Sequence, residues 1–234
     1  MAIVDKLELL MHGDLTVTGR LVDASNATLY ATLRRGQEMM TCIYKPVAGE
    51  RPLWDFEDGN LAHREYAAYI LSQALGFHIV PMTVLREGPY GFGMVQEWID
   101  IDDSIDLADF FSQDHPQLRQ MAIFDAIINN TDRKIGHLLP TKEGALYGCD
   151  HGVTFHTDDK LRTVLWQWAG DALTAPELAQ LSEALDIFGS DLDLTPYLTR
   201  AECDSISARI KRLISKAVMP SPSPDWPAVP WPAF

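Results

Sequence analysis

The sequence is poor in cysteine, in basic residues and in long apolar runs. Its 234 residues include 3 cysteines, and because none belongs to a C-x-x-C pair, a disulfide framework or a cysteine-based zinc site is not expected. The 19 Lys and Arg residues are outnumbered by 33 Asp and Glu, which gives a net charge of −14. Nucleic acid and anionic membranes would repel such a chain, so neither is expected as a partner.

No apolar stretch approaches the roughly 20 residues that span a bilayer. The first residues, MAIVDKLELLMHGD, do not resemble a secretory signal. We therefore expect a cytoplasmic protein without a stable membrane anchor. What the chain does have is 47% hydrophobic residues, which is ample for a buried core.

The apolar pattern changes character near residue 98. Before it, alternating residues predict strands, and helical periodicity predicts one helix among them. The strands are expected at 15–22, 28–34, 39–46, 79–86 and 92–98, and the helices of this half at 3–12 and 61–75. Further helices are expected at 107–111, 116–129, from 174 onward and at 202–218. This order predicts an α+β protein with two lobes and a cleft between them.

We divide the chain into three parts on this basis. A small lobe of antiparallel sheet and one helix is expected over 1–98, and a larger helical lobe over 99–219. Residues 220–234 form a tail with six prolines, which cannot continue the preceding helix. Its Trp and Phe side chains are costly to leave in water, at about 1.5–3 kcal/mol each. We therefore expect the tail to pack on its own large lobe or on a protein partner, and the alternative is a disordered tail.

Two charged residues of the first half are candidates for binding phosphate. Lys45 alternates with apolar residues near the end of its strand, so it is either a solvated lysine or a phosphate anchor that needs a carboxylate partner. Glu65 offers that carboxylate from a helix rich in Ala, Tyr and Leu. Ser25 and Asn26, in the turn between the first two strands, could hold phosphate through a hydroxyl and backbone N–H groups. Ordinary hairpin turns contain the same residue types.

The second half has two aspartates, Asp132 and Asp150, that suit phosphoryl transfer from ATP. In that reaction one carboxylate orients the attacking group, and another binds the Mg²⁺ that bridges the phosphates. Arg133 and Lys134 stand beside Asp132 and would hold its carboxylate ionised and oriented. His137 is a candidate ligand of a metal or a phosphate. Asp150 ends a strand-like run and can project into a cleft.

These residues resemble the phosphoinositide 3/4-kinase-like branch of the protein-kinase-like superfamily, and most of all the type II phosphatidylinositol 4-kinases. The segment 130–133, Asn-Thr-Asp-Arg, matches their catalytic loop, and 150–155, Asp-His-Gly-Val-Thr-Phe, matches their metal loop. The segments 65–76 and 80–83 are similar to a helix and strand of their small lobe. The chain is also similar to a group of uncharacterised actinobacterial kinase-like proteins.

The resemblance implies a two-lobed protein-kinase-like fold with ATP and Mg²⁺ or Mn²⁺ as cofactors. Lys45 would contact the α- and β-phosphates and pair with Glu65. Gln96, Glu97 and Trp98 would line the hinge against adenine, mostly through their backbone.

In the same comparison Asp132 would position the nucleophile and Asp150 would hold the metal. His137 departs from the family, which has a metal-binding Asn at this place, and imidazole suits Mn²⁺ better than Mg²⁺. The family's cysteine cluster and basic membrane surface are absent, which favours a soluble small-molecule or protein hydroxyl as acceptor. We predict an ATP-dependent kinase. The alternatives are a nucleotide-binding pseudokinase that regulates a partner and an AMP transferase.

Overall fold

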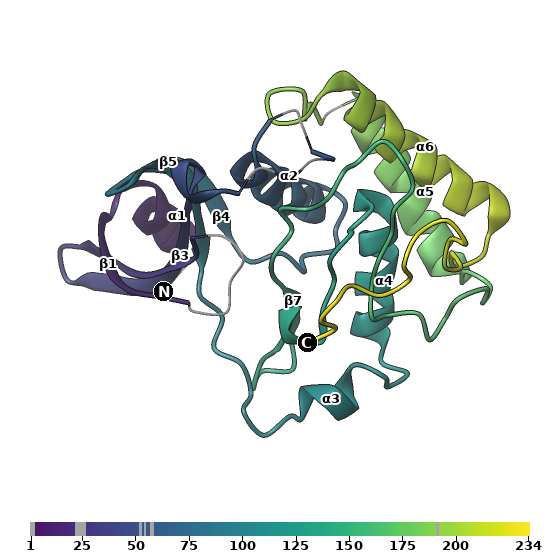
Figure 1. Ribbon diagram of the computed structural model, residues 1–234, viewed down its shortest axis with the longest axis horizontal. Helices are drawn as coiled ribbons and strands as arrows, with labels where there is room; N and C mark the ends of the chain where they lie inside the picture. Colours follow the sequence, from purple (N-terminus) through teal and green to yellow (C-terminus); the bar gives the residue numbers. More distant parts are fainter. Residues whose placement is uncertain (1–2, 22–26, 52, 54, 57–58, 191) are drawn as a thin grey trace.

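The computed structural model describes residues 3–21, 27–51, 53, 55–56, 59–190 and 192–234. Its first half is built on a five-stranded antiparallel sheet (Figure 1) with the strand order β1-β2-β3-β5-β4. The strands are β1 (Asp14–Arg20), β2 (Leu29–Arg35), β3 (Glu38–Pro46), β4 (Thr83–Gly88) and β5 (Gly91–Glu97). The central strand is therefore β3, which lies between β2 and β5 and carries Lys45 near its end.

Helix α1 (Ile3–His12) packs against this sheet. Its Leu9 and Leu10 are fully buried in a core that includes residues of β2, β3, β4 and β5. The end of the helix is tied to β4, because Arg86 Nη1 donates to Leu10 O at 2.8 Å and to Gly13 O at 2.9 Å. The sheet thus has its own core, separate from the larger one.

Helix α2 (Leu61–Ala74) begins at a doubly capped N-terminus. Asn60 Oδ1 accepts the His63 N–H at 2.8 Å, and the Glu50 carboxylate accepts the N–H groups of Leu61 and Ala62 at 2.9 Å each. These side chains satisfy donors that have no partner inside the helix. The start of α2 is therefore fixed to the segment that follows β3.

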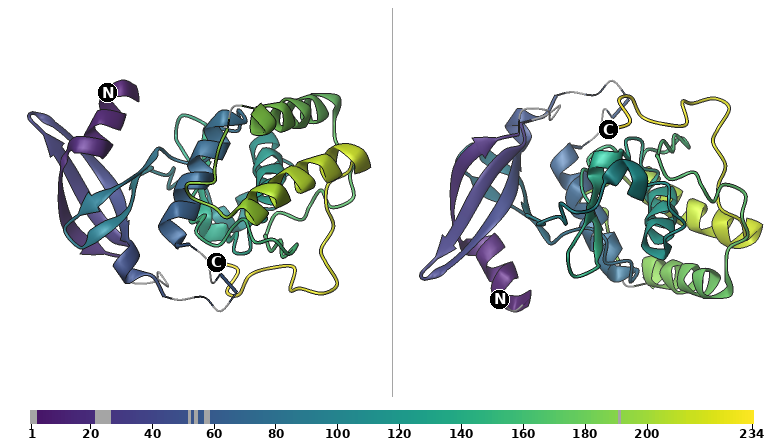
Figure 2. Two further views of the ribbon diagram at one scale, coloured as in Figure 1. Left: turned by 90° about the horizontal axis from the view of Figure 1, so that it is seen from above. Right: turned by 90° about the horizontal axis from the view of Figure 1, so that it is seen from below.

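The body of α2 is anchored to the helical half of the molecule. Its Arg64 forms a buried ion pair with Glu202 of α6 (Arg200–Lys216) at 2.5 Å, and Arg64 Nη1 also donates to Thr154 O at 2.9 Å. The apolar side chains of α2, including the fully buried Leu71, belong to the large core. Figure 2 shows α2 between the sheet and the remaining helices.

The helical half contains α3 (Leu107–Phe110), α4 (Pro116–Ile128), α5 (Ala175–Ser190) and α6, with a small hairpin of β6 (Leu138–Pro140) and β7 (Leu146–Gly148). Nearly every residue of α4 from Leu118 onward is buried, so this helix forms the middle of the large core. The predicted α+β class, with an antiparallel sheet and a helical region, is confirmed. None of the helices in the described ranges combines the length and apolar character needed to span a bilayer.

One predicted strand starts in the wrong place. The alternating residues from 79 onward predicted a strand over 79–86, whereas β4 begins at Thr83. The N–H groups of Ile79 and Val80 donate to Ser72 Oγ of α2, at 3.0 and 3.3 Å, instead of to a neighbouring strand. Pro81 has no N–H to offer. Residues 79–82 therefore join α2 to the sheet.

The tail from Pro220 lies along the large lobe, as one of the two predicted arrangements had it (Figure 2). Its backbone accepts three hydrogen bonds from earlier segments, one of them from Trp166 Nε1 to Ala228 O at 2.8 Å. Ile135 N donates to Ala233 O at 2.9 Å, and Thr163 N donates to Ala228 O at 3.1 Å. The tail is thus held by polar contacts of its main chain.

The reason given for this packing was partly wrong. Trp226 does find a partner, because Lys160 Nζ lies 4.6 Å from the centre of its ring. Trp231 and Phe234, however, remain 93% and 66% exposed. Burial of these two aromatic side chains therefore contributes little to holding the tail.

Candidate active site

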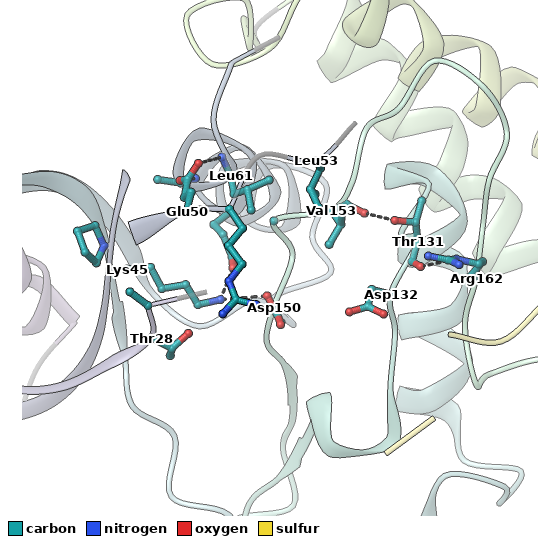
Figure 3. Close-up of a pocket in the computed structure, with 16 residues that line it drawn as sticks. Thr28, Lys45, Glu50, Leu53, Leu61, Thr131, Asp132, Asp150, Val153 and Arg162 are labelled. Carbon is teal, nitrogen blue, oxygen red and sulfur yellow. Dashed lines mark hydrogen bonds and ion pairs between the residues drawn. The ribbon is translucent and has the colours of Figure 1, made fainter. Parts of the chain in front are cut away.

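Three charged side chains from three segments meet in the cleft. Lys45 Nζ of β3 lies 2.6 Å from Glu65 Oε1 of α2 and 3.0 Å from Asp150 Oδ1 (Figure 3). The second oxygen of Glu65, Oε2, accepts the His151 N–H at 2.9 Å. The Glu65 side chain is nearly inaccessible to solvent, and a buried carboxylate requires partners of this kind. Glu65 therefore fixes both the lysine and the backbone that follows Asp150.

Lys45 and Asp150 hold each other in the ionised state, whereas burial raises the pKa of Glu65. Burial alone would lower the pKa of Lys45, but Asp150 and Glu65 outweigh it and raise that pKa above its usual value. In return, Lys45 holds the pKa of Asp150 well below its usual value. At neutral pH the cluster thus presents an ammonium and a carboxylate side by side.

Two cavities meet at this cluster, and Thr28, Lys45 and Asp150 line both. The larger, here the hinge-side cavity, has a volume of about 570 Å³ and extends along residues 96–99 toward Leu139 and His137. The smaller, here the α2-side cavity, has a volume of about 270 Å³ and extends toward Leu61, Thr131, Asp132, Val153 and Arg162.

Asp132 lies on the far side of the α2-side cavity, beside Thr131 and Arg162 (Figure 3). Its backbone N–H donates to Asn130 Oδ1 at 3.0 Å, and its carboxylate lies 3.4 Å from Lys134 Nζ. Burial raises the pKa of the Asp132 carboxyl, and the charge of Lys134 opposes that rise. The charge of Lys134 therefore does not outweigh burial, and the catalytic role proposed for Lys134 stays a prediction. A partly buried carboxylate with a raised pKa is suited to accepting a proton.

Arg133 lies elsewhere, although it was proposed with Asp132 and Lys134 as catalytic. It is fully buried and is not among the residues that line either cavity. Its Nε and Nη2 donate to the two oxygens of Asp125 at 2.9 Å each, and Nη1 donates to Cys149 O at 2.9 Å. Nη2 also lies 2.7 Å from His151 Nε2. Arg133 therefore joins the segments of Asp132 and Asp150 from behind the site.

The two residues predicted to hold a metal ion, Asp150 and His137, lie close together. His137 Nε2 lies 3.6 Å from Asp150 Oδ2, and burial lowers the pKa of His137 to about 4. The imidazole is therefore neutral at pH 7, as a metal ligand must be. Within the described ranges, no group of three or more His, Cys, Asp or Glu side chains could hold a metal by itself. The pair therefore fits an ion that is bound together with phosphate oxygens and water.

The three proposed hinge residues border the hinge-side cavity. Gln96 is buried and its Nε2 donates to Thr83 Oγ1 at 2.9 Å. Glu97 forms an ion pair with Lys6 of α1, and Trp98 Nε1 donates to Asp100 at 3.0 Å. Their side chains are thus engaged by the protein, and the N–H groups of Glu97 and Trp98 also donate within it, to Met82 O at 2.8 Å and to Thr41 O at 3.2 Å. Ser25 and Asn26 lie outside the described residues.

Sequence reasoning missed three residues that shape the site. Arg162 lines the α2-side cavity and its Nε donates to Thr131 O at 2.9 Å, but no motif singles it out. Glu50 caps α2 from a segment that looked like a loop. Asp125, the partner of Arg133, could have been found, because a lone acid in the apolar helix 116–128 requires a buried cation.

The fold is similar to the folds of solved structures of kinases. The Golgi casein kinase with Mn/ADP bound is similar with a TM-score of 0.59 and 14% identity, over 91% of this chain and 74% of that one. Hydra Fam20 with sugar is similar with a TM-score of 0.57 and 15% identity, over 92% and 88%. Such identities establish the fold alone. The phosphoinositide 3/4-kinase-like branch stays a prediction.

No family model matches the sequence. A relative over almost the whole length is protein Rv2133c of Mycobacterium tuberculosis (strain ATCC 25618 / H37Rv). It is 40% identical over 267 aligned residues, which cover 98% of this chain and 96% of the relative. The chain belongs to the family of Rv2133c.

Proposed function

We propose that the protein is an ATP-dependent phosphotransferase that works with a divalent cation. The observation that carries the proposal is the cluster of Lys45, Glu65 and Asp150 at the junction of two cavities, with Asp132 across one of them. Phosphoryl transfer needs a cation for the phosphates, a carboxylate for the metal and a carboxylate for the nucleophile. The Mn/ADP complex of a structural neighbour supports the same pair of cofactors.

The hinge-side cavity is proposed to bind the nucleotide. It is the larger of the two, and its lining includes the apolar side chains of Ile43, Ile99 and Leu139, against which an adenine ring would pack. The phosphates would then reach the junction, where Lys45 donates to their oxygens while Glu65 keeps its side chain extended. Asp150 and His137 would hold Mg²⁺ or Mn²⁺, which neutralises charge on the phosphates.

The α2-side cavity is proposed to admit the acceptor. Asp132 lines this cavity, so a hydroxyl that enters there lies between Asp132 and the phosphates at the junction. The carboxylate would orient that hydroxyl and take its proton. Lys134, 3.4 Å from Asp132, would then balance the charge that remains. A volume of about 270 Å³ suits a small molecule or one side chain of a protein.

A second candidate is a nucleotide-binding protein that regulates a partner without transferring phosphate. The observation in its favour is His137, whose nitrogen replaces the amide oxygen expected for a Mg²⁺ ligand. Both candidates bind the nucleotide, but only the phosphotransferase needs the Asp132 carboxylate, to activate the acceptor hydroxyl.

Thermal unfolding with ATP and Mn²⁺ or Mg²⁺ tests nucleotide binding, which both candidate functions require. A ligand at 100 times its Kd stabilises the folded state by about 2.7 kcal/mol. For a chain of this size that corresponds to a rise in Tm of roughly 5–11 °C. The Lys45→Met variant should lose this rise, whereas Lys142→Met, an exposed lysine outside both cavities, should keep it.

Mass spectrometry of protein and acceptor mixtures then separates transfer from binding alone. A gain of one phosphate that requires Asp132 supports the phosphotransferase. Nucleotide binding in which the Asp132→Asn variant behaves like the wild type in every respect supports the regulator. An unchanged Tm at millimolar ATP with either metal would remove both.

A further inference from the structure

A third cavity lies in the large lobe, away from the candidate active site. It has a volume of about 460 Å³ and lies between the second half of α6, the first residues of the tail and the segment 159–170. We call it the α6 cavity. It is lined by Ala126, Asn129, Asp159, Leu161, Trp166, Gly170, Arg209, Arg212, Leu213, Lys216, Val218, Met219, Pro220, Ser221 and Ser223. Among the described residues, it shares no lining residue with the hinge-side or α2-side cavity.

The α6 cavity is positively charged in a strongly acidic protein. Three cations line it, Arg209, Arg212 and Lys216, against one carboxylate, Asp159. The same carboxylate serves both arginines, with Oδ1 3.1 Å from Arg209 Nε and Oδ2 2.8 Å from Arg212 Nη1. The lining therefore carries a formal charge of +2 (three cations less one anion), whereas the whole chain carries −14.

Arg209 is the most buried of these cations, and its pairing is incomplete. It is only 3% exposed, and its Nη2 donates to the backbone oxygens of His156 and Thr157. Its Nη1 is buried and has no hydrogen-bond partner in the part of the chain that the structure describes. A buried charge with incomplete pairing is costly, and burial lowers the pKa of this guanidinium. An anion in the cavity would relieve that cost through its charge, even at a few ångströms.

The helix dipole does not account for this charge. Basic residues near a helix C-terminus do complement the dipole, but the partial charge there is only about −0.5 and acts within the last turn. Helix α6 ends at Lys216, so Arg209 lies about two turns before the end. The excess of +2 in the cavity exceeds what the dipole can balance.

We propose that the α6 cavity is a binding site for the phosphate monoester of a small organic molecule. A phosphate monoester carries about −1.5 to −2 at pH 7, which matches the excess charge, whereas a carboxylate would balance only half of it. Arg212, Lys216 and the hydroxyl of Ser221 offer donors to the phosphate. Trp166 and Met219 provide apolar surface for the organic part. The site does not depend on the proposed phosphotransferase activity.

Isothermal titration of the full-length protein with phenyl phosphate tests the site, with inorganic phosphate as a second probe. The Arg212→Ala/Lys216→Ala variant should bind phenyl phosphate about tenfold more weakly or worse, because both accessible cations are gone. The matched control is Arg200→Ala/Lys211→Ala, which removes two exposed cations of the same helix outside the cavity. It should stay within about twofold of the wild type. Inorganic phosphate should bind more weakly than phenyl phosphate, because it does not use Trp166.

Four results would overturn the proposal. The first is no binding of either probe at millimolar concentration, and the second is equal weakening in both double variants. The third is loss of phenyl phosphate binding in Lys45→Met, or its competition by ATP with Mn²⁺, which would assign the anion to the active-site cleft. The fourth is sedimentation with phosphatidylcholine vesicles that contain phosphatidic acid, lost in Arg212→Ala/Lys216→Ala, without binding of phenyl phosphate. That result would assign the site to a lipid head group.

Discussion

Replacing Asp125 by Asn should destabilise the protein more than any exposed substitution. Asp125 and Arg133 are both fully buried, and the two carboxylate oxygens accept from Nε and Nη2 of the arginine at 2.9 Å each. Asn keeps the shape of the side chain but removes its charge and turns an NH₂ group toward an arginine donor. The Arg133 charge is then left buried without its counterion.

The cost of breaking a buried ion pair on one side is about 3–5 kcal/mol. At about 2–4 °C per kcal/mol for a chain of this length, Tm should fall by roughly 6–20 °C. The assay is urea unfolding followed by far-UV circular dichroism, with the slope against urea compared to show that the same cooperative unit unfolds. Asp186→Asn on the exposed face of α5 is the matched control, and it should change stability by no more than about 0.5 kcal/mol.

A double variant separates the ion pair from simple loss of packing. Asp125→Leu with Arg133→Met removes both charges and keeps apolar volume, so it should recover most of the lost stability. If Asp125→Asn costs less than about 1 kcal/mol, or if the double variant is no better than the single one, the charge pair does not hold this part of the structure as argued.

Three further results are expected. Burial lowers the pKa of His137 from 6.5 to about 4, so between these pH values the unfolded chain binds a proton at His137 that the folded chain does not. The free energy of unfolding should therefore fall as the pH drops through this range. Urea melts of His137→Asn should lack this pH-dependent component. Asp150→Ala should lose metal-dependent ATP affinity in calorimetry, whereas Asp132→Ala should keep it and lose transfer, and equal binding by both variants would contradict this division of roles. Deleting 229–234 should remove the acceptor of the Ile135 N–H, so hydrogen exchange at that amide should become faster, and unchanged protection would show that the tail is not needed there.

The sequence was most informative where local chemistry decides the structure. Helical periodicity and a following glycine gave the helix at 61–75 almost to its ends, because such signals act within a few residues. The strand predicted over 79–86 failed at its start, where Ser72 takes the backbone donors of Ile79 and Val80. A contact between a helix side chain and a later backbone segment leaves no periodic signal in the sequence.

The same distinction applies to the candidate site. Lys45 and Glu65 could be selected because a lone charge in apolar surroundings requires a partner, and Asp150 because it ends a strand-like run. The structure brings the three together. Arg133 could not be separated from its neighbours Asp132 and Lys134, since the direction of a side chain in an irregular loop depends on distant contacts. Arg162 is held beside the segment of Asp132 by long-range contacts, because its backbone N–H donates to Asn130 O and its backbone O accepts the Arg133 N–H.

The contacts that anchor α2 determine how the cleft can open. The Arg64–Glu202 pair ties the body of α2, which carries Glu65, to the helical half of the molecule, whereas Lys45 belongs to the sheet. A rotation of the sheet away from the helices would therefore withdraw one ammonium from two carboxylates at once. In the protein without ligand, the two ion pairs of Lys45 should accordingly resist separation of the sheet from the helices. A divalent cation bound beside Asp150 would balance part of the charge that Lys45 balances without ligand. Binding of the cation with the nucleotide would therefore weaken the hold of Lys45 on the two carboxylates and let the sheet adjust around the nucleotide.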